Sequence, residues 1–115
     1  MHNSKYLALL HNYTLCLHEK RFYDAHEALE QIWFPRRFEA NNEIKLLKGF
    51  INAAVSFELL KRGRVEAAQR VWKNYLKYRP LLENLHSRYT CDYKAIAKHI
   101  ETLFSHYRSN NFLLQ

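Results

Sequence analysis

Turn-forming residues are scarce in this chain. Its 115 residues include only two glycines, Gly49 and Gly63, and two prolines, Pro35 and Pro80. A sheet protein needs a tight turn about every ten residues, and glycine and proline form most such turns. Helices need far fewer turns, so the sequence predicts an all-α fold, a compact up-and-down bundle of about five helices. The glycine-rich loops of P-loop and Rossmann proteins, which bring backbone amides to phosphates, are also excluded.

Composition indicates one domain over residues 1–115. Hydrophobic residues make up 48% of the chain and aromatic residues 15%, which is enough apolar surface for a core without disulfides. Cys16 and Cys91 lie far apart and outside any CxxC pattern, which argues against a zinc knuckle or a redox pair. No apolar run approaches the roughly 20 residues of a membrane span, and the first residues lack a signal-peptide pattern. We therefore expect a cytoplasmic protein without membrane association.

Apolar residues recur every three or four positions, which is the spacing of amphipathic helices. Pro35 should end the second helix and Pro80 should break the fourth, because proline cannot continue a helix. Asn3 or Ser4 could cap the first helix, and Gly63 suits the left-handed turn that ends the third. The expected helices span residues 4–20, 23–34, 42–63, 64–80 and 92–107.

The same pattern predicts which helix lies at the centre. The third expected helix is apolar around most of its circumference, as a helix with several neighbours must be. Gly49 within it should permit close contact with another helix, which would offset its cost of about 1 kcal/mol relative to alanine. The fourth expected helix should bury only one stripe, formed by Val65, Ala68, Val71, Trp72, Tyr75 and Leu76.

Titratable residues cluster in the segment FYDAHEALEQIW, residues 22–33. His26 and Glu30 are four positions apart and Glu27 and Glu30 are three apart, so these side chains project from neighbouring strips of one helix. Such a group could bind a divalent metal or exchange protons. The pattern resembles the HExxH helix of zinc proteases, but Glu30 replaces the second histidine, so the two-histidine clamp is absent.

Two interpretations of this cluster remain open. A metal site at His26 and Glu30 would need a third ligand, such as Glu58, and would suit a metal carrier or a metal-dependent hydrolase that uses His26, Glu27 and Glu30. We favour a structural network, in which His26, Glu30 and Lys48 satisfy one another against the third helix. On that interpretation no cofactor is expected.

Residues of the second and third helices carry a family resemblance. The residues Phe22 to Trp33, the segment LKGFINAA at 47–54 and the Gly63 turn resemble the small all-helical prokaryotic family numbered 309 among the domains of unknown function. The resemblance covers residues 22–85 and implies a helical bundle without an established activity. Asn52 stands where this family is expected to have glutamine, so a ligand held there would meet a shorter amide.

Positive charge is the remaining feature of the sequence. The chain has a formal net charge of +7, and Arg70, Lys73 and Lys77 share one face of the fourth expected helix. Phosphate neutralisation with stacking on Tyr75 and Tyr78 would suit nucleic acid, although lysine and arginine also commonly fill a solvated face.

The sequence thus favours a non-enzymatic binding or assembly module. Its expected binding cluster lies between the second and third helices and consists of His26, Glu27, Glu30, Lys48 and Asn52. The partner could be a protein, a small molecule or a second copy of the chain. A divalent-metal site and nucleic-acid association through Arg70, Lys73 and Lys77 are the alternatives.

Overall fold

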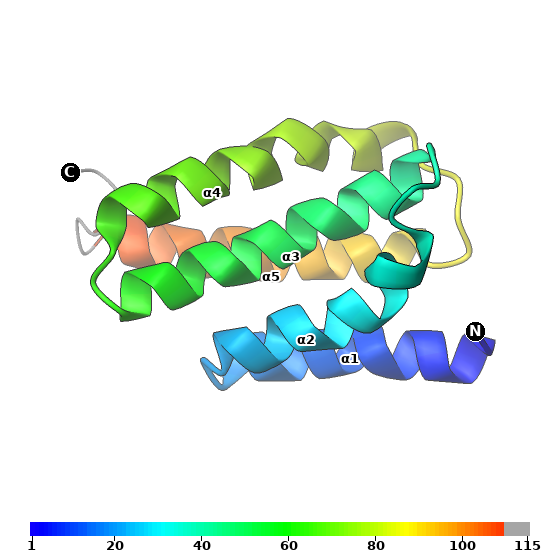
Figure 1. The fold of residues 1–115 in the computed structure, drawn as a ribbon, viewed down its shortest axis with the longest axis horizontal. Helices are drawn as coiled ribbons and strands as arrows, with labels where there is room; N and C mark the ends of the chain where they lie inside the picture. Colours follow the sequence, from blue (N-terminus) through cyan, green and yellow to red (C-terminus); the bar gives the residue numbers. More distant parts are fainter. Residues whose placement is uncertain (110–115) are drawn as a thin grey trace.

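The computed structural model describes residues 1–109 and contains helices but no strand within that range (Figure 1). It confirms the all-α bundle. The helices are α1 (Asn3–His18), α2 (Phe22–Trp33), α3 (Asn42–Lys61), α4 (Val65–Tyr78) and α5 (Thr90–Ser109), with short 3-10 helices η1 (Phe34–Arg36) and η2 (Arg79–Asn84). None of the helices in residues 1–109 is long and apolar enough to cross a membrane.

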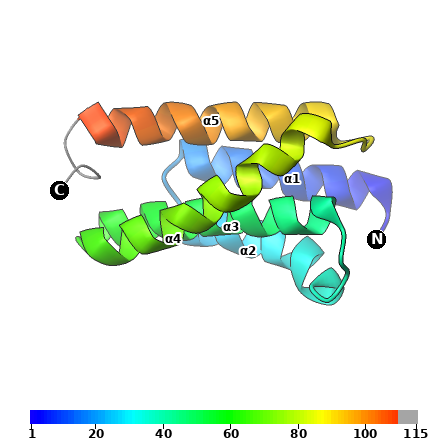
Figure 2. The ribbon, with the colours of Figure 1, turned by 90° about the horizontal axis from the view of Figure 1, so that it is seen from above.

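The central helix is α3. It runs antiparallel to α4 on one side and packs against α2 on the other, while α5 runs along the bundle beside α1 (Figures 1 and 2). Gly63, with a φ of 78°, makes the left-handed turn between α3 and α4. The predicted all-round burial of α3 is confirmed by its buried residues Leu46, Leu47, Phe50, Ala53, Ala54 and Phe57.

The predicted helix ends hold with small changes. The side chain of Asn41 accepts a hydrogen bond from the Ile44 amide at 2.9 Å and caps α3. Pro80 ends the regular helix, because α4 stops at Tyr78 and η2 follows. The predicted cap of α1 is wrong: the cap is His2, whose Nδ1 accepts from the Ser4 amide at 3.2 Å.

Gly49 lies where α3 closely approaches the end of α4. A Cβ atom at Gly49 would lie 3.0 Å from the Cβ of Tyr78, so the absence of a side chain permits the close approach that the sequence predicts. The buried stripe of α4 is narrower than predicted. Trp72 and Tyr75 are buried, but Leu76 is 53% exposed, because it lies beyond the side of α4 that faces its neighbours.

Helix α5 is held to α4 by polar contacts. Tyr75 Oη and Arg79 Nε both donate to the Glu101 carboxylate, at 2.6 and 2.7 Å. Burial, followed by the hydrogen bond to Glu101, raises the pKa of Tyr75 well above its ordinary value near 10. The Tyr75 hydroxyl therefore serves the packing of α4 against α5.

Candidate functional site

The His26–Glu30 pair forms as the α2 sequence predicts. His26 Nε2 lies 3.0 Å from Glu30 Oε1, and the two side chains are 22% and 27% exposed. The other ring nitrogen, His26 Nδ1, is buried and has no hydrogen-bond partner among residues 1–109. A buried polar atom without a partner costs about 1–3 kcal/mol.

Other members of the predicted cluster lie apart from this pair. Glu27 is exposed and associates with Tyr23, where a hydrogen bond and the carboxylate charge raise the pKa of the tyrosine. Lys48 does not complete the network: its Nζ lies 4.1 Å from the centroid of the Trp33 ring, and within the described chain no hydrogen bond or ion pair joins it to His26 or Glu30.

Asn52 contacts a different neighbour. Its Nδ2 donates to the Lys48 carbonyl at 2.7 Å, and its Oδ1 accepts from Asn74 Nδ2 at 3.3 Å. The amide therefore links α3 to α4. The expected five-residue binding cluster is divided between the α2 side and the α4 side of α3.

A shallow groove of about 210 Å³ lies between α2 and α3 beside His26. Its floor is apolar, and the Tyr23 ring, 55% exposed, stands 5.6 Å from the His26 ring at its edge. Glu58 Oε2 accepts from Arg62 Nε at 2.7 Å along the α3 side. This α2–α3 groove is lined by Phe22, Tyr23, His26, Val55, Glu58, Leu59 and Arg62.

The three suggested metal ligands are not gathered at one point. Glu58 and His26 both line the α2–α3 groove, but Glu58 is paired with Arg62 and His26 with Glu30. Across residues 1–109, no three histidine, cysteine, aspartate or glutamate side chains are arranged to hold a metal ion. His26, Glu30 and Glu58 therefore do not form the three-ligand set that the sequence suggested.

The basic residues of α4 lie at the surface. Arg70, Lys73 and Lys77 are all exposed, and Lys77 Nζ lies 5.2 Å from the centroid of the Tyr78 ring. Tyr75, however, is buried, so its ring does not stand beside them as a stacking surface.

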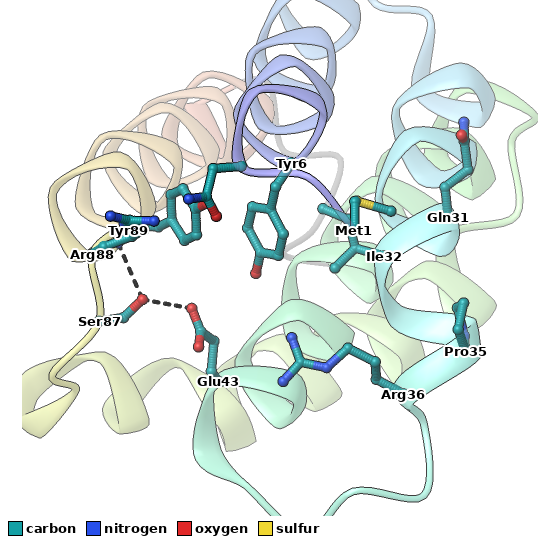
Figure 3. A pocket seen from close by; sticks show the side chains of 11 residues that line it. Met1, Tyr6, Gln31, Ile32, Pro35, Arg36, Glu43, Ser87, Arg88 and Tyr89 are labelled. Carbon is teal, nitrogen blue, oxygen red and sulfur yellow. Dashed lines mark hydrogen bonds between the residues drawn. The ribbon is translucent and has the colours of Figure 1, made fainter.

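A pocket of about 630 Å³ that the sequence did not predict lies at one end of the bundle (Figure 3). Segments that are distant in the chain meet there, namely the start of α1, the end of α2 with η1, the start of α3 and the loop before α5. We call it the end pocket. It is lined by Met1, Asn3, Tyr6, Gln31, Ile32, Pro35, Arg36, Glu43, Ser87, Arg88 and Tyr89.

One carboxylate organises the floor of the end pocket. Glu43 Oε2 accepts from Tyr93 Oη at 2.5 Å and from Ser87 Oγ at 2.6 Å. Tyr93 Oη in turn lies 2.5 Å from Tyr6 Oη, whose ring stacks on Tyr89 with centroids 4.2 Å apart. The floor is therefore a continuous chain of hydroxyl groups that ends on a carboxylate.

Burial raises the pKa of both tyrosines in this chain of hydrogen bonds, Tyr6 and Tyr93. Burial is the main cause that raises the pKa of Tyr6 to about 12, and the Glu43 charge adds to it. Burial also raises the pKa of Tyr93, reinforced by its hydrogen bonds to Glu43 and Tyr6. Both hydroxyls keep their protons at neutral pH.

The sequence contains little sign of the end pocket. Its hydrogen bonds join residues 44, 50 and 87 positions apart, so no local spacing connects them. The available signal was chemical: Tyr6 and Tyr93 place hydroxyl groups on apolar helix stripes, and a buried hydroxyl needs a partner.

Comparison with known proteins gives a family but no described relative. No curated protein and no solved structure matches the chain. A family model described as a domain of unknown function, DUF309, matches residues 10–71, which is more than half of the chain. The matched range includes all of α2 and α3 and both sides of the α2–α3 groove. The chain belongs to the DUF309 family.

Proposed function

We propose that this domain is a non-enzymatic binding module whose α2–α3 groove receives one apolar side chain of a protein partner. The observation that carries the proposal is the exposed Tyr23 ring beside an open apolar floor of Phe22, Val55 and Leu59. Aromatic residues at the edge of a small pocket are typical anchors of protein interfaces. The groove volume of about 210 Å³ is below the usual range of small-molecule pockets, which favours a single inserted side chain.

Local charge favours a basic partner. Of the three carboxylates on α2, Asp24 pairs with Arg21 and Glu30 with His26, whereas the exposed Glu27 beside Tyr23 forms no ion pair among residues 1–109. Charge complementarity sets specificity and association rate at interfaces. The expected partner segment therefore presents lysine or arginine next to its apolar anchor.

The pairing of charges along the groove supports binding rather than catalysis. Glu30 is paired with His26, and Glu58 is paired with Arg62. A general base must be within reach of the proton that it abstracts. These groups instead frame an apolar floor, which suits recognition of a side chain.

Peptide selection tests this proposal. A random peptide library selected on the wild-type domain should yield peptides with a large aliphatic or aromatic residue beside lysine or arginine. Tyr23→Ala and Val55→Lys should each weaken binding of those peptides at least about tenfold. Phe38→Ala is the matched control, because Phe38 is 88% exposed and does not line the groove.

Two results would reject the groove as the binding site. One is a selection without any enriched peptide of that composition. The other is a set of selected peptides that bind the Tyr23→Ala and Val55→Lys variants as tightly as the wild type, with circular dichroism showing that both variants are folded.

A further inference from the structure

The end pocket has the size and polarity of a small-molecule site. Its volume of about 630 Å³ falls within the range typical of ligand pockets. Figure 3 shows the Tyr6 hydroxyl, the Glu43 carboxylate and the Arg36 guanidinium pointing toward one another, with Arg88 on the side opposite Arg36. Polar groups of both signs therefore face one space.

The floor of the end pocket offers only hydrogen-bond acceptors. A carboxylate donates no proton, so Tyr93 and Ser87 donate theirs to Glu43. Because the single proton of Tyr93 is used in this way, Tyr6 donates its own proton to the Tyr93 oxygen. The Tyr6 lone pairs and Glu43 Oε1 remain free to accept hydrogen bonds from a ligand.

The two arginines of the rim, Arg36 and Arg88, offer only donors. Arg36 uses Nε and one N–H of Nη2 on Glu39, both at 3.0 Å, which leaves both N–H groups of Nη1 and the second N–H of Nη2. Arg88 is exposed and forms no ion pair with any described residue. Within residues 1–109 no ion pair joins Arg36 to Glu43 either, so opposite charges stay separated across the pocket.

We propose that the end pocket binds a small zwitterion of the α-amino acid class. The ligand ammonium group donates to the Tyr6 oxygen and Glu43 Oε1, and its carboxylate accepts from the Arg36 guanidinium on the neighbouring side. An apolar ligand side chain then lies against Ile32 and Pro35.

Ligands with charge of one sign fit less well. A simple anion would satisfy Arg36 but would face the Glu43 carboxylate, and a simple cation would satisfy Glu43 but would face the Arg36 guanidinium. Like charges that face each other in a partly desolvated site repel. A molecule with both groups satisfies the floor and the rim together.

Nuclear magnetic resonance titration of the ¹⁵N-labelled domain tests the proposal with three probes. L-leucine has both groups, N-acetyl-L-leucine lacks the ammonium, and L-leucine methyl ester lacks the carboxylate. L-leucine should shift the amide resonances of residues 31–36 and 87–89, and it should bind at least about tenfold more tightly than either blocked compound.

Matched variants assign each end of the ligand. Arg36→Gln should weaken L-leucine binding at least about tenfold and leave the methyl ester unaffected. Arg37→Gln is the control, because Arg37 Nη1 donates to the Phe34 carbonyl and Arg37 does not line the pocket. Tyr6→Phe should weaken L-leucine but not N-acetyl-L-leucine.

The proposal is overturned if L-leucine at its solubility limit leaves the resonances of residues 31–36 and 87–89 unchanged. It is equally overturned if both blocked compounds bind as tightly as L-leucine. A titration in which Arg36→Gln and Arg37→Gln behave alike would also reject the assigned orientation.

Discussion

The α2–α3 groove and the end pocket are built in different ways. Along the α2–α3 groove, each polar contact joins residues four positions apart on one helix, His26 with Glu30 and Glu58 with Arg62. At the end pocket, Glu43 of α3 holds Tyr93 of α5 and the preceding loop residue Ser87. The polar contacts of the groove therefore join no two helices, whereas those of the end pocket link separate segments and help to hold the bundle together.

Removing the shared carboxylate should have the largest effect on stability. Glu43→Ala leaves the buried hydroxyl of Tyr93 and that of Ser87 without their acceptor. An unsatisfied buried group costs about 1–3 kcal/mol, so we expect the free energy of unfolding to fall by about 3 kcal/mol. Urea denaturation followed by circular dichroism measures this change.

Glu39→Ala is the control for that substitution. Glu39 is an exposed carboxylate that pairs only at the surface with Arg36, and such pairs contribute about 0–1 kcal/mol. Equal losses in the two variants would show that Glu43 has no special structural role and would remove the contrast between the two regions.

Alkaline pH should have the second largest effect on the free energy of unfolding, through Tyr6 in the end pocket. Above about pH 10 the unfolded chain releases its tyrosine protons, while folded Tyr6 keeps its proton until its pKa of about 12. The folded state then binds more protons than the unfolded state, so the free energy of unfolding falls as the pH rises. One pKa unit corresponds to about 1.4 kcal/mol, so Tyr6 by itself accounts for roughly 2 kcal/mol between pH 10 and 12.

Comparison of the wild type with Tyr6→Phe isolates this contribution. Between about pH 7 and 9 the folded and unfolded states of both proteins hold their tyrosine protons, and Tyr6 adds no pH dependence. At about pH 11 the wild type should lose more stability, relative to neutral pH, than Tyr6→Phe does. Identical pH profiles in urea denaturation would contradict the shifted pKa.

Replacing His26 beside the α2–α3 groove should have the smallest effect, and it should raise the free energy of unfolding rather than lower it. His26→Leu removes the unpartnered buried Nδ1 and gives up a pair with Glu30 that is worth only about 0.2–0.5 kcal/mol. The free energy of unfolding should therefore rise by about 1 kcal/mol, as thermal denaturation would show. A clear loss of stability would instead identify His26 as a structural residue that the fold requires.

Local rules explain what the sequence predicts well. Helix periodicity places the five helices, and the spacing of four on α2 pairs His26 with Glu30. Proline and glycine mark the ends of α3 and α4 because they act on the backbone of one or two residues. Competition between partners is less predictable: the Lys48 ammonium lies over the Trp33 ring rather than beside Glu30.

The sequence does not predict the hydrogen bonds of the end pocket, because they join segments that meet only in the folded bundle. Tyr6, Tyr93 and the loop residue Ser87 reach Glu43 only because the starts of α1, α3 and α5 meet at one end of the bundle. The family match ends at residue 71, so it includes Glu43 but neither Ser87 nor Tyr93. Nothing in the local pattern around Glu43 distinguishes it from an ordinary acidic residue in the first turn of a helix.

The reach of the Glu43 hydrogen bonds has a consequence for the order of folding. Contacts across 44 and 50 residues close large loops, so they form after the local turns between neighbouring helices. A nascent chain that ends before Ser87 contains the sequence of α1 to α4, yet it lacks the last wall of the end pocket. A molecule bound in the end pocket would therefore stabilise the complete folded chain and none of its partly folded forms. Its binding would oppose unfolding of the whole domain.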